Sequence, residues 1–138
     1  MDNSELAQKL RTLIEAERAG VFVARALLEE VEDPDYRSLL VVILDGERDS
    51  CRLLGRMIMR LGENSGGVVG DFHEKVMALD DDAERLRLLI KGQDWVVRKV
   101  DELLDGDLES SFAEDLDEMK KVHVVNIDLC KQYLGNLT

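Results

Sequence analysis

The sequence has 138 residues, enough for one domain with a buried core, and its many Leu, Glu, Asp and Arg residues beside a single Pro favour helices over strands. Acidic residues outnumber basic residues by 30 to 18, which gives a net charge of −12. Such a surface repels phosphate groups, so we expect no nucleic-acid partner and no membrane partner. The polar amino terminus has no apolar signal core, and the longest apolar run, Leu39 to Leu44, is too short to span a bilayer. We therefore predict a cytoplasmic protein.

Four long helices are predicted from their start and stop signals. The stretch DNSE at Asp2 has the pattern of a capping box, and Asp33-Pro34 combines an N-cap with a proline suited to the first helical turn. Asp81 and Ser111 each precede a Glu by three residues and open the other two helices. Glycines stand at or near three of the four ends. The predicted ranges are 2–31, 33–61, 81–106 and 111–135.

The connections between these helices predict how they pack. The first and last connections are short, so each joins an antiparallel pair. The middle connection starts with GENSGGVVG and continues as DFHEKVMAL, which predicts a short extra helix from Asp71 to Leu79. We predict a single all-α domain over residues 1–138: a four-helix bundle with a long central connection. That connection can just span a helix of roughly 40 Å, so a crossover and an up-down-up-down topology both stay open.

A polar layer is predicted halfway along the bundle. The bundle seam, with its alternating spacing of three and four residues, is apolar at both ends of each long helix and polar near the middle. Mid-helix positions meet at one level whichever way the helices run, and residues three positions apart share a helix face. We expect a buried layer made of Glu17, Glu47, Ser50, Gln93, His123 and Asn126.

This pattern resembles the ferritin-like superfamily, whose metal-binding members carry one Glu on each of two helices and Glu-x-x-His on the other two. Glu17 matches the first-helix Glu, and ERDS at Glu47 has Ser where the motif has His. Gln93 replaces the third-helix Glu, and HVVN at His123 departs from its motif at both ligand positions. The stretches FHEKVMAL, KGQDWVVRK and HVVNIDLC also resemble a small family of bacterial and archaeal ferritin-like four-helix domains. The resemblance implies a fold with a degenerate di-metal site, and no particular activity.

The polar layer allows three functions. The leading hypothesis is a hydrogen-bonded network in a non-enzymatic domain that acts in assembly or partner binding and needs no cofactor. The first alternative is a metal-dependent oxidoreductase with a reduced, mononuclear ligand set, in which Glu17, Glu47 and His123 hold a single weakly bound Fe, Mn or Zn ion. The second is small-ligand binding in the polar bundle core. A working di-iron centre would need more carboxylates and imidazoles than this layer offers.

Two apolar surfaces lie outside the predicted bundle core. Trp95 falls on the helix face away from Gln93, so the segment FHEKVMAL or a partner chain should cover it. The run LLVVIL is apolar on all sides, which one seam cannot bury. We therefore predict a homodimer through Val41, Val42 and Leu44, and leave room for a further protein partner.

The remaining reactive side chains are given structural roles. Cys51 and Cys130 form no CxxC pair and are predicted to be buried reduced thiols, although the sequence leaves a disulfide between them open. His73 lies in the middle connection and is predicted to be a surface or packing residue.

Overall fold

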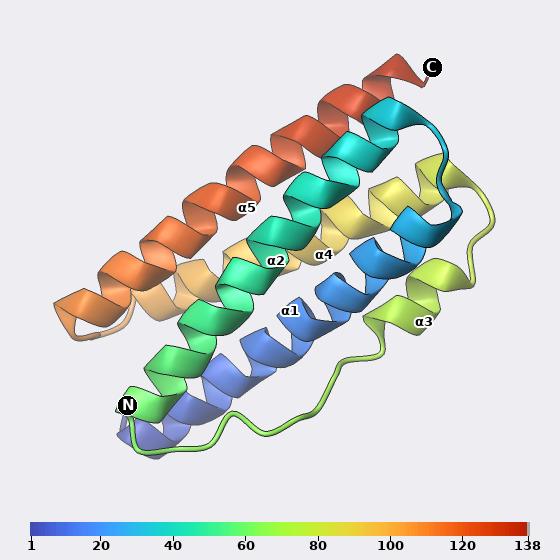
Figure 1. Cartoon of the computed structure of the whole chain (residues 1–138). Coiled ribbons are helices and arrows are strands. Elements are labelled where there is room, and N and C mark those ends of the chain that lie inside the picture. Colours follow the sequence, from blue (N-terminus) through green and yellow to red (C-terminus); the bar gives the residue numbers. More distant parts are fainter. Residues whose placement is uncertain (138) are drawn as a thin grey trace.

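Helices account for all the regular structure in the computed structural model, which describes residues 1–137. Four long helices lie side by side and a short one lies at one edge beside α1 (Figure 1). The predicted ranges differ from the observed ones by at most two residues at either end, and the all-α prediction is confirmed. In chain order the helices are α1 (Asn3–Glu30), α2 (Pro34–Arg60), α3 (Phe72–Met77), α4 (Asp82–Leu104) and α5 (Ser110–Asn136).

Side-chain caps fix three of the long helices at their amino-terminal ends. The carboxylates of Asp2, Asp33 and Asp81 each accept a hydrogen bond from a backbone N–H three residues later, at distances of 2.8, 2.9 and 3.0 Å respectively. The fourth predicted cap is wrong, because α5 begins at Ser110 and has no side-chain cap. The Ser111 hydroxyl instead donates to Glu109 and accepts a bond from the Arg60 guanidinium.

The long connection makes a crossover. It runs along the length of the molecule from the end of α2 to α3, so α2 and α4 point in the same direction (Figure 1). Helix α1 packs against α2, α4 packs against α5, and α2 contacts α5. Helices α1 and α4 approach each other only slightly, and α3 packs against both. The gap between α1 and α4 is thus covered by α3 rather than closed by direct helix packing.

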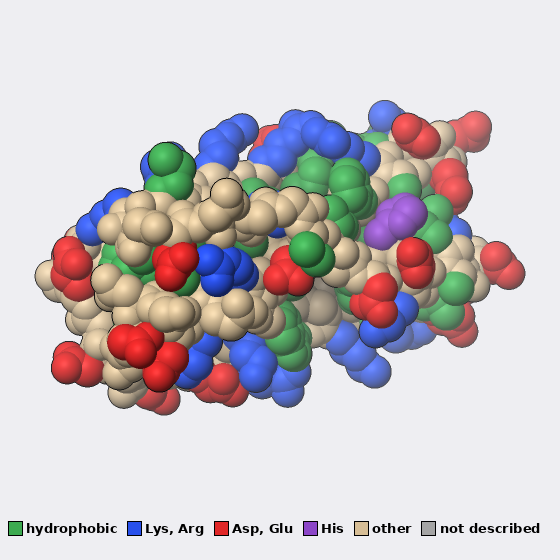
Figure 2. Space-filling view, turned by 90° about the horizontal axis from the view of Figure 1, so that it is seen from below, with side chains coloured by type: hydrophobic (Ala, Val, Ile, Leu, Met, Phe, Trp, Pro, Cys, Tyr) green, Lys and Arg blue, Asp and Glu red, His purple; other side chains and the backbone are tan. Residues whose placement is uncertain are grey.

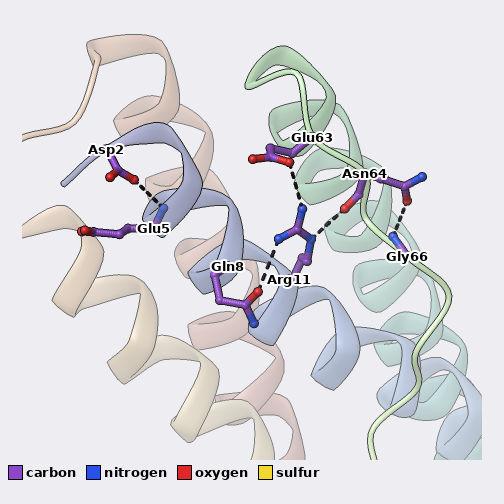
Figure 3. A network of polar contacts seen from close by, with 7 residues as sticks. All are labelled: Asp2, Glu5, Gln8, Arg11, Glu63, Asn64 and Gly66. Atoms are coloured by element: carbon purple, nitrogen blue, oxygen red, sulfur yellow. Dashed lines mark hydrogen bonds and ion pairs between the residues drawn. The ribbon is translucent and has the colours of Figure 1, made fainter.

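Two arginines of α1 fasten the connection. The Arg11 guanidinium donates to the backbone carbonyl of Asn64 at 2.7 Å and to the Glu63 carboxylate at 3.3 Å (Figure 3). The Arg18 guanidinium donates to the carbonyls of Gly66 and Val68 at 2.8 and 3.0 Å. These bonds hold an otherwise irregular segment against α1. Figure 2 shows the face along which the connection runs, where hydrophobic side chains lie among charged ones.

The polar layer divides the core into two apolar clusters. One lies towards the start of α1 and includes Leu10, Leu54, Val100 and Leu116, all at most 1% exposed. The other lies towards its end and includes Leu27, Leu40, Leu86 and Cys130. Each fully buried Leu contributes roughly 1.5–3 kcal/mol through loss of apolar surface from water.

The two apolar surfaces predicted from the sequence are buried to different extents. Trp95 is partly buried against the first cluster, while the FHEKVMAL segment packs beside it through Phe72 at Gly92. Val41 and Val42 are 46% and 43% exposed. Leu44 was expected in a dimer interface, and this is wrong, because its side chain is buried in the second cluster. Within residues 1–137, no helix is long and apolar enough to cross a membrane.

Candidate metal centre

Three potential metal ligands meet in the middle of the helical core. Glu17 comes from α1, Glu47 from α2 and His123 from α5, and their side chains are between 1% and 6% exposed. One ligand atom from each lies within 4.8 Å of the others. Ser50, Gln93 and Asn126 are buried as well. Helix periodicity produces this meeting, because each residue occupies the seam position of its helix halfway along.

The orientation of the His123 ring decides what its second nitrogen can do. Nδ1 lies 2.9 Å from the Met119 carbonyl oxygen, which can only accept, so Nδ1 carries the proton and donates it. In the neutral ring, Nε2 then presents a lone pair. Nε2 lies 3.1 Å from both carboxyl oxygens of Glu17 and 4.0 Å from Glu47 Oε1. A lone pair facing carboxylate oxygens requires a positive centre between them, either a proton or a metal ion.

Without metal, the two carboxyl groups of the cluster also share a proton. Burial raises the pKa of Glu17 to about 7, against the opposing effect of hydrogen bonds from Glu47 and Ser50. Burial, and then the neighbouring charge of Glu17, raise the pKa of Glu47 well above its usual range. Glu47 is therefore the protonated partner and donates to Glu17. The geometry is that of carboxyl groups which a cation would bring to full ionisation.

Two glycines leave space for the side chains of this cluster. The spacing of the seam residues did not predict this role. A Cβ atom on Gly20 of α1 would lie 2.8 Å from Cδ of Glu47, closer than real Cβ atoms come to such a neighbour. A Cβ on Gly46 of α2 would lie 2.8 Å from Nδ2 of Asn126. Glycine inside a helix is destabilising by roughly 0.5–1 kcal/mol relative to Ala, so a packing reason of this kind is its usual explanation. A glycine in the middle of a predicted helix was therefore a signal that the sequence offered.

Gln93 occupies the open side of the cluster. Its side chain is 4% exposed, and neither its Nε2 nor its Oε1 finds a hydrogen-bond partner among residues 1–137. It therefore does not join the hydrogen-bonded cluster. Together with Glu17 and Glu47, it lines a cavity of about 540 Å³ between α1, α3 and α4.

The donor set fits a single metal ion and does not fit two. Two carboxylates and one imidazole suit Fe, Mn or Zn with open positions left on the metal. Ser50, Gln93 and Asn126 stand where a dinuclear site would need further carboxylates and imidazoles, and their neutral groups balance little of a second divalent charge. The Gln93 amide beside the cluster has no hydrogen-bond partner within residues 1–137, as expected if the open side of the metal held a bound molecule that paired with this amide.

The other reactive residues lie outside this cluster. His73 is on α3, where its ring packs edge-on against Phe22 at a centroid distance of 6.5 Å. Cys51 and Cys130 are both free thiols, so no disulfide joins them. Cys130 is buried as predicted, whereas the prediction is wrong for Cys51, which is only partly buried. Burial raises the pKa of each thiol to about 12, which leaves little reactive thiolate near neutral pH.

Comparison with known proteins places the chain in a family. The family model described as Domain of unknown function (DUF6306) matches residues 4–132. Neither the curated proteins nor the solved structures contain a match to the chain.

Proposed function

The chain belongs to the DUF6306 family, and we propose that it is a ferritin-like four-helix bundle that binds a single divalent transition-metal ion through Glu17, Glu47 and His123. The observation that carries this proposal is the imidazole lone pair aimed at two buried carboxyl groups. A metal ion would replace the proton that holds these groups together in the metal-free chain.

The surroundings of the three residues support metal binding. The Met119 carbonyl fixes the His123 tautomer, and the Ser50 hydroxyl bonds to Glu17, as outer groups do around protein metal sites. An Fe, Mn or Zn ion bound there would supply Lewis-acid chemistry, and Fe or Mn also one-electron chemistry, at the wall of the cavity. The chain's own residues would orient the ligands and limit the access of water to the centre.

A second candidate is the hydrogen-bonded layer of a non-enzymatic domain that binds a protein partner or a second copy of itself. It is favoured by the contacts already present, since a proton between Nε2 of His123 and Glu17 would pair both ring nitrogens, and Glu47 shares a proton with Glu17. In this reading the layer fixes the register of the helices and holds no ion.

Metal titration of chelator-treated protein separates the two candidates. We expect wild-type protein to bind close to a single zinc or manganese ion per chain by calorimetry and elemental analysis. Glu47→Gln and His123→Ala should each lower the affinity roughly 10- to 100-fold or more. The matched control is Glu15→Gln, a carboxylate on the same cavity wall that is not in the cluster. Weak binding that is equal in all four proteins would favour the structural layer, and two ions per chain would contradict a mononuclear site.

A further inference from the structure

The cavity beside Gln93 has the size of a binding site. Its volume of about 540 Å³ lies within the range of roughly 300–1,000 Å³ that holds small ligands. Small residues face it, with Ala16 and Gly20 on α1 and Gly92 on α4. Phe72 of α3 closes against Gly92, where a Cβ atom would lie 2.8 Å from the ring. Helix α3 therefore forms one wall of a pocket that direct packing of α1 on α4 would have filled.

Gln93 supplies the polar anchor in this cavity. Its amide is buried, lines the cavity, and has both a donor and an acceptor without partners within residues 1–137. An unpaired buried polar group costs about 1–3 kcal/mol, so most such groups in folded proteins are paired. The complement of a carboxamide is a group that both donates and accepts a hydrogen bond. A hydroxyl or another primary amide meets that requirement, whereas a carboxylate can only accept.

The rest of the cavity wall is mainly apolar. The aliphatic side chains of Ile43, Leu89 and Val96 and the indole of Trp95 line it. Sites of this kind hold an apolar body and use a few polar groups to fix its orientation.

The charges around the buried end of the cavity favour a neutral polar group there. Gln93 lies at this end with the carboxyl groups of Glu17 and Glu47. Three basic side chains also line the cavity, but all of them are exposed: Lys75, Lys91 and Arg98. An anionic end group beside Gln93 would therefore lie next to two carboxyl groups, and it could not both donate and accept a hydrogen bond as the amide requires. A substrate role for the bound molecule rests on the proposed metal function, whereas the cavity and the Gln93 amide do not depend on it.

We propose that this cavity binds a small neutral molecule with an apolar body and a hydroxyl or primary amide end, which pairs with Gln93 and reaches the open side of the Glu17, Glu47 and His123 cluster. The site thereby acquires a substrate class: neutral alcohols or amides, rather than acids or amines.

Trp95 gives a direct readout, because it lines the cavity and is the chain's only tryptophan. We would titrate zinc-loaded protein with hexanamide and with hexanoate, which match in length and differ in charge and hydrogen-bond donors, and follow fluorescence and calorimetric heat. Hexanamide should bind at least about tenfold more tightly than hexanoate. Gln93→Leu should weaken hexanamide binding roughly 5- to 100-fold and remove its advantage.

A matched pair of leucine variants tests where the molecule binds. Ala16→Leu fills the cavity and should abolish hexanamide binding while zinc stoichiometry stays unchanged. Ala113→Leu adds the same side chain on α5, outside the cavity, and should leave both properties unaltered. Circular dichroism confirms that each variant is folded.

The outcomes separate this inference from the proposed function. If hexanamide produces neither a fluorescence change nor heat, or binds Gln93→Leu and Ala16→Leu as well as wild type, the inference is wrong even where zinc binds. Tighter binding of hexanoate would overturn the neutral polar end. If zinc does not bind, the proposed function fails, and the same titration of metal-free protein still decides the inference.

Discussion

Burial makes the chemistry of His123 and Glu17 depend on the groups that contact them in the protein interior. Both are 1% exposed, so neither can exchange its partner for water. Glu17 instead contacts the His123 imidazole and accepts hydrogen bonds from the Glu47 carboxyl group and the Ser50 hydroxyl. The protonation of this cluster is therefore part of the folding free energy.

A pH-dependent stability follows for the metal-free protein. Because burial raises the pKa of Glu17 to about 7 from a usual 4.5, the folded state binds more protons than the unfolded state between these values. The contribution is fully present below about pH 4.5 and is lost as the pH rises through about 7. We expect wild type to lose about 3 kcal/mol relative to Glu17→Gln over this interval, as an order of magnitude. Urea unfolding of both proteins at several pH values, with a chelator present, measures it. A constant difference between the two would contradict the expectation.

The sequence predicted which residues share the layer, because a seam position depends only on spacing along each helix. It did not predict which way the His123 ring faces, because the Met119 carbonyl that orients it is a backbone group without a sequence signature. Nor did it predict that the Gln93 amide has no hydrogen-bond partner among the described residues 1–137, because that depends on the cavity left between α1 and α4. Positions along one helix could be predicted from the sequence, whereas contacts between helices could not.

Helix α3 is the smallest element and has the largest effect on the shape of the site. Its sequence signal was correct, but its position depends on a contact that spacing cannot show. The Phe72 ring lies against the bare Cα of Gly92, 2.8 Å from where a Cβ atom would be. This contact sets how closely α3 covers the cavity.

Gly92→Ala should push α3 away from α4. Ala normally stabilises a helix interior by roughly 0.5–1 kcal/mol relative to Gly, so destabilisation here would report the clash with Phe72. We expect a net loss of about 1–2 kcal/mol in the free energy of unfolding, and faster hydrogen exchange across α3. Gly55→Ala is the control, because its nearest neighbour would be Ile14 Cδ1 at 3.9 Å, and this variant should be as stable as wild type or more so. Phe72→Leu combined with Gly92→Ala should recover part of the loss, and equal stability of the two Ala variants would rule out the contact.

At the scale of the whole molecule, the exposed valines are the main feature that the fold leaves without a role. Val41 and Val42 of α2 were identified from the sequence, whereas Val122, Val124 and Val125 of α5 were not, although α5 packs beside α2. The sequence also did not predict the crossover. Connection length allowed both topologies, and the observed path depends on arginine bonds to backbone carbonyls.

We predict a homodimer that buries the exposed valines of α2. Val41→Lys and Val42→Lys should each raise the dissociation constant by about tenfold or more, because a buried ammonium group would lack a partner. Val68→Lys is the control, since Val68 is 60% exposed on the connection, away from α2. Sedimentation velocity over a range of concentrations measures the effect. A wild-type monomer at the highest concentration would refute the dimer.

The crossover also has a consequence for the order of folding events. Each antiparallel helix pair is local in sequence and can form quickly, but the pairs must then dock through contacts far apart in the chain. Glu17 and Glu47 belong to the first pair, and Gln93 and His123 belong to the second. Neither pair alone holds a complete ligand set, so an ion that binds all three ligands recognises only the docked state. Added metal should therefore slow unfolding and leave the early folding phase unchanged. The metal would stabilise the two helix pairs after they have docked, and it would not nucleate their folding.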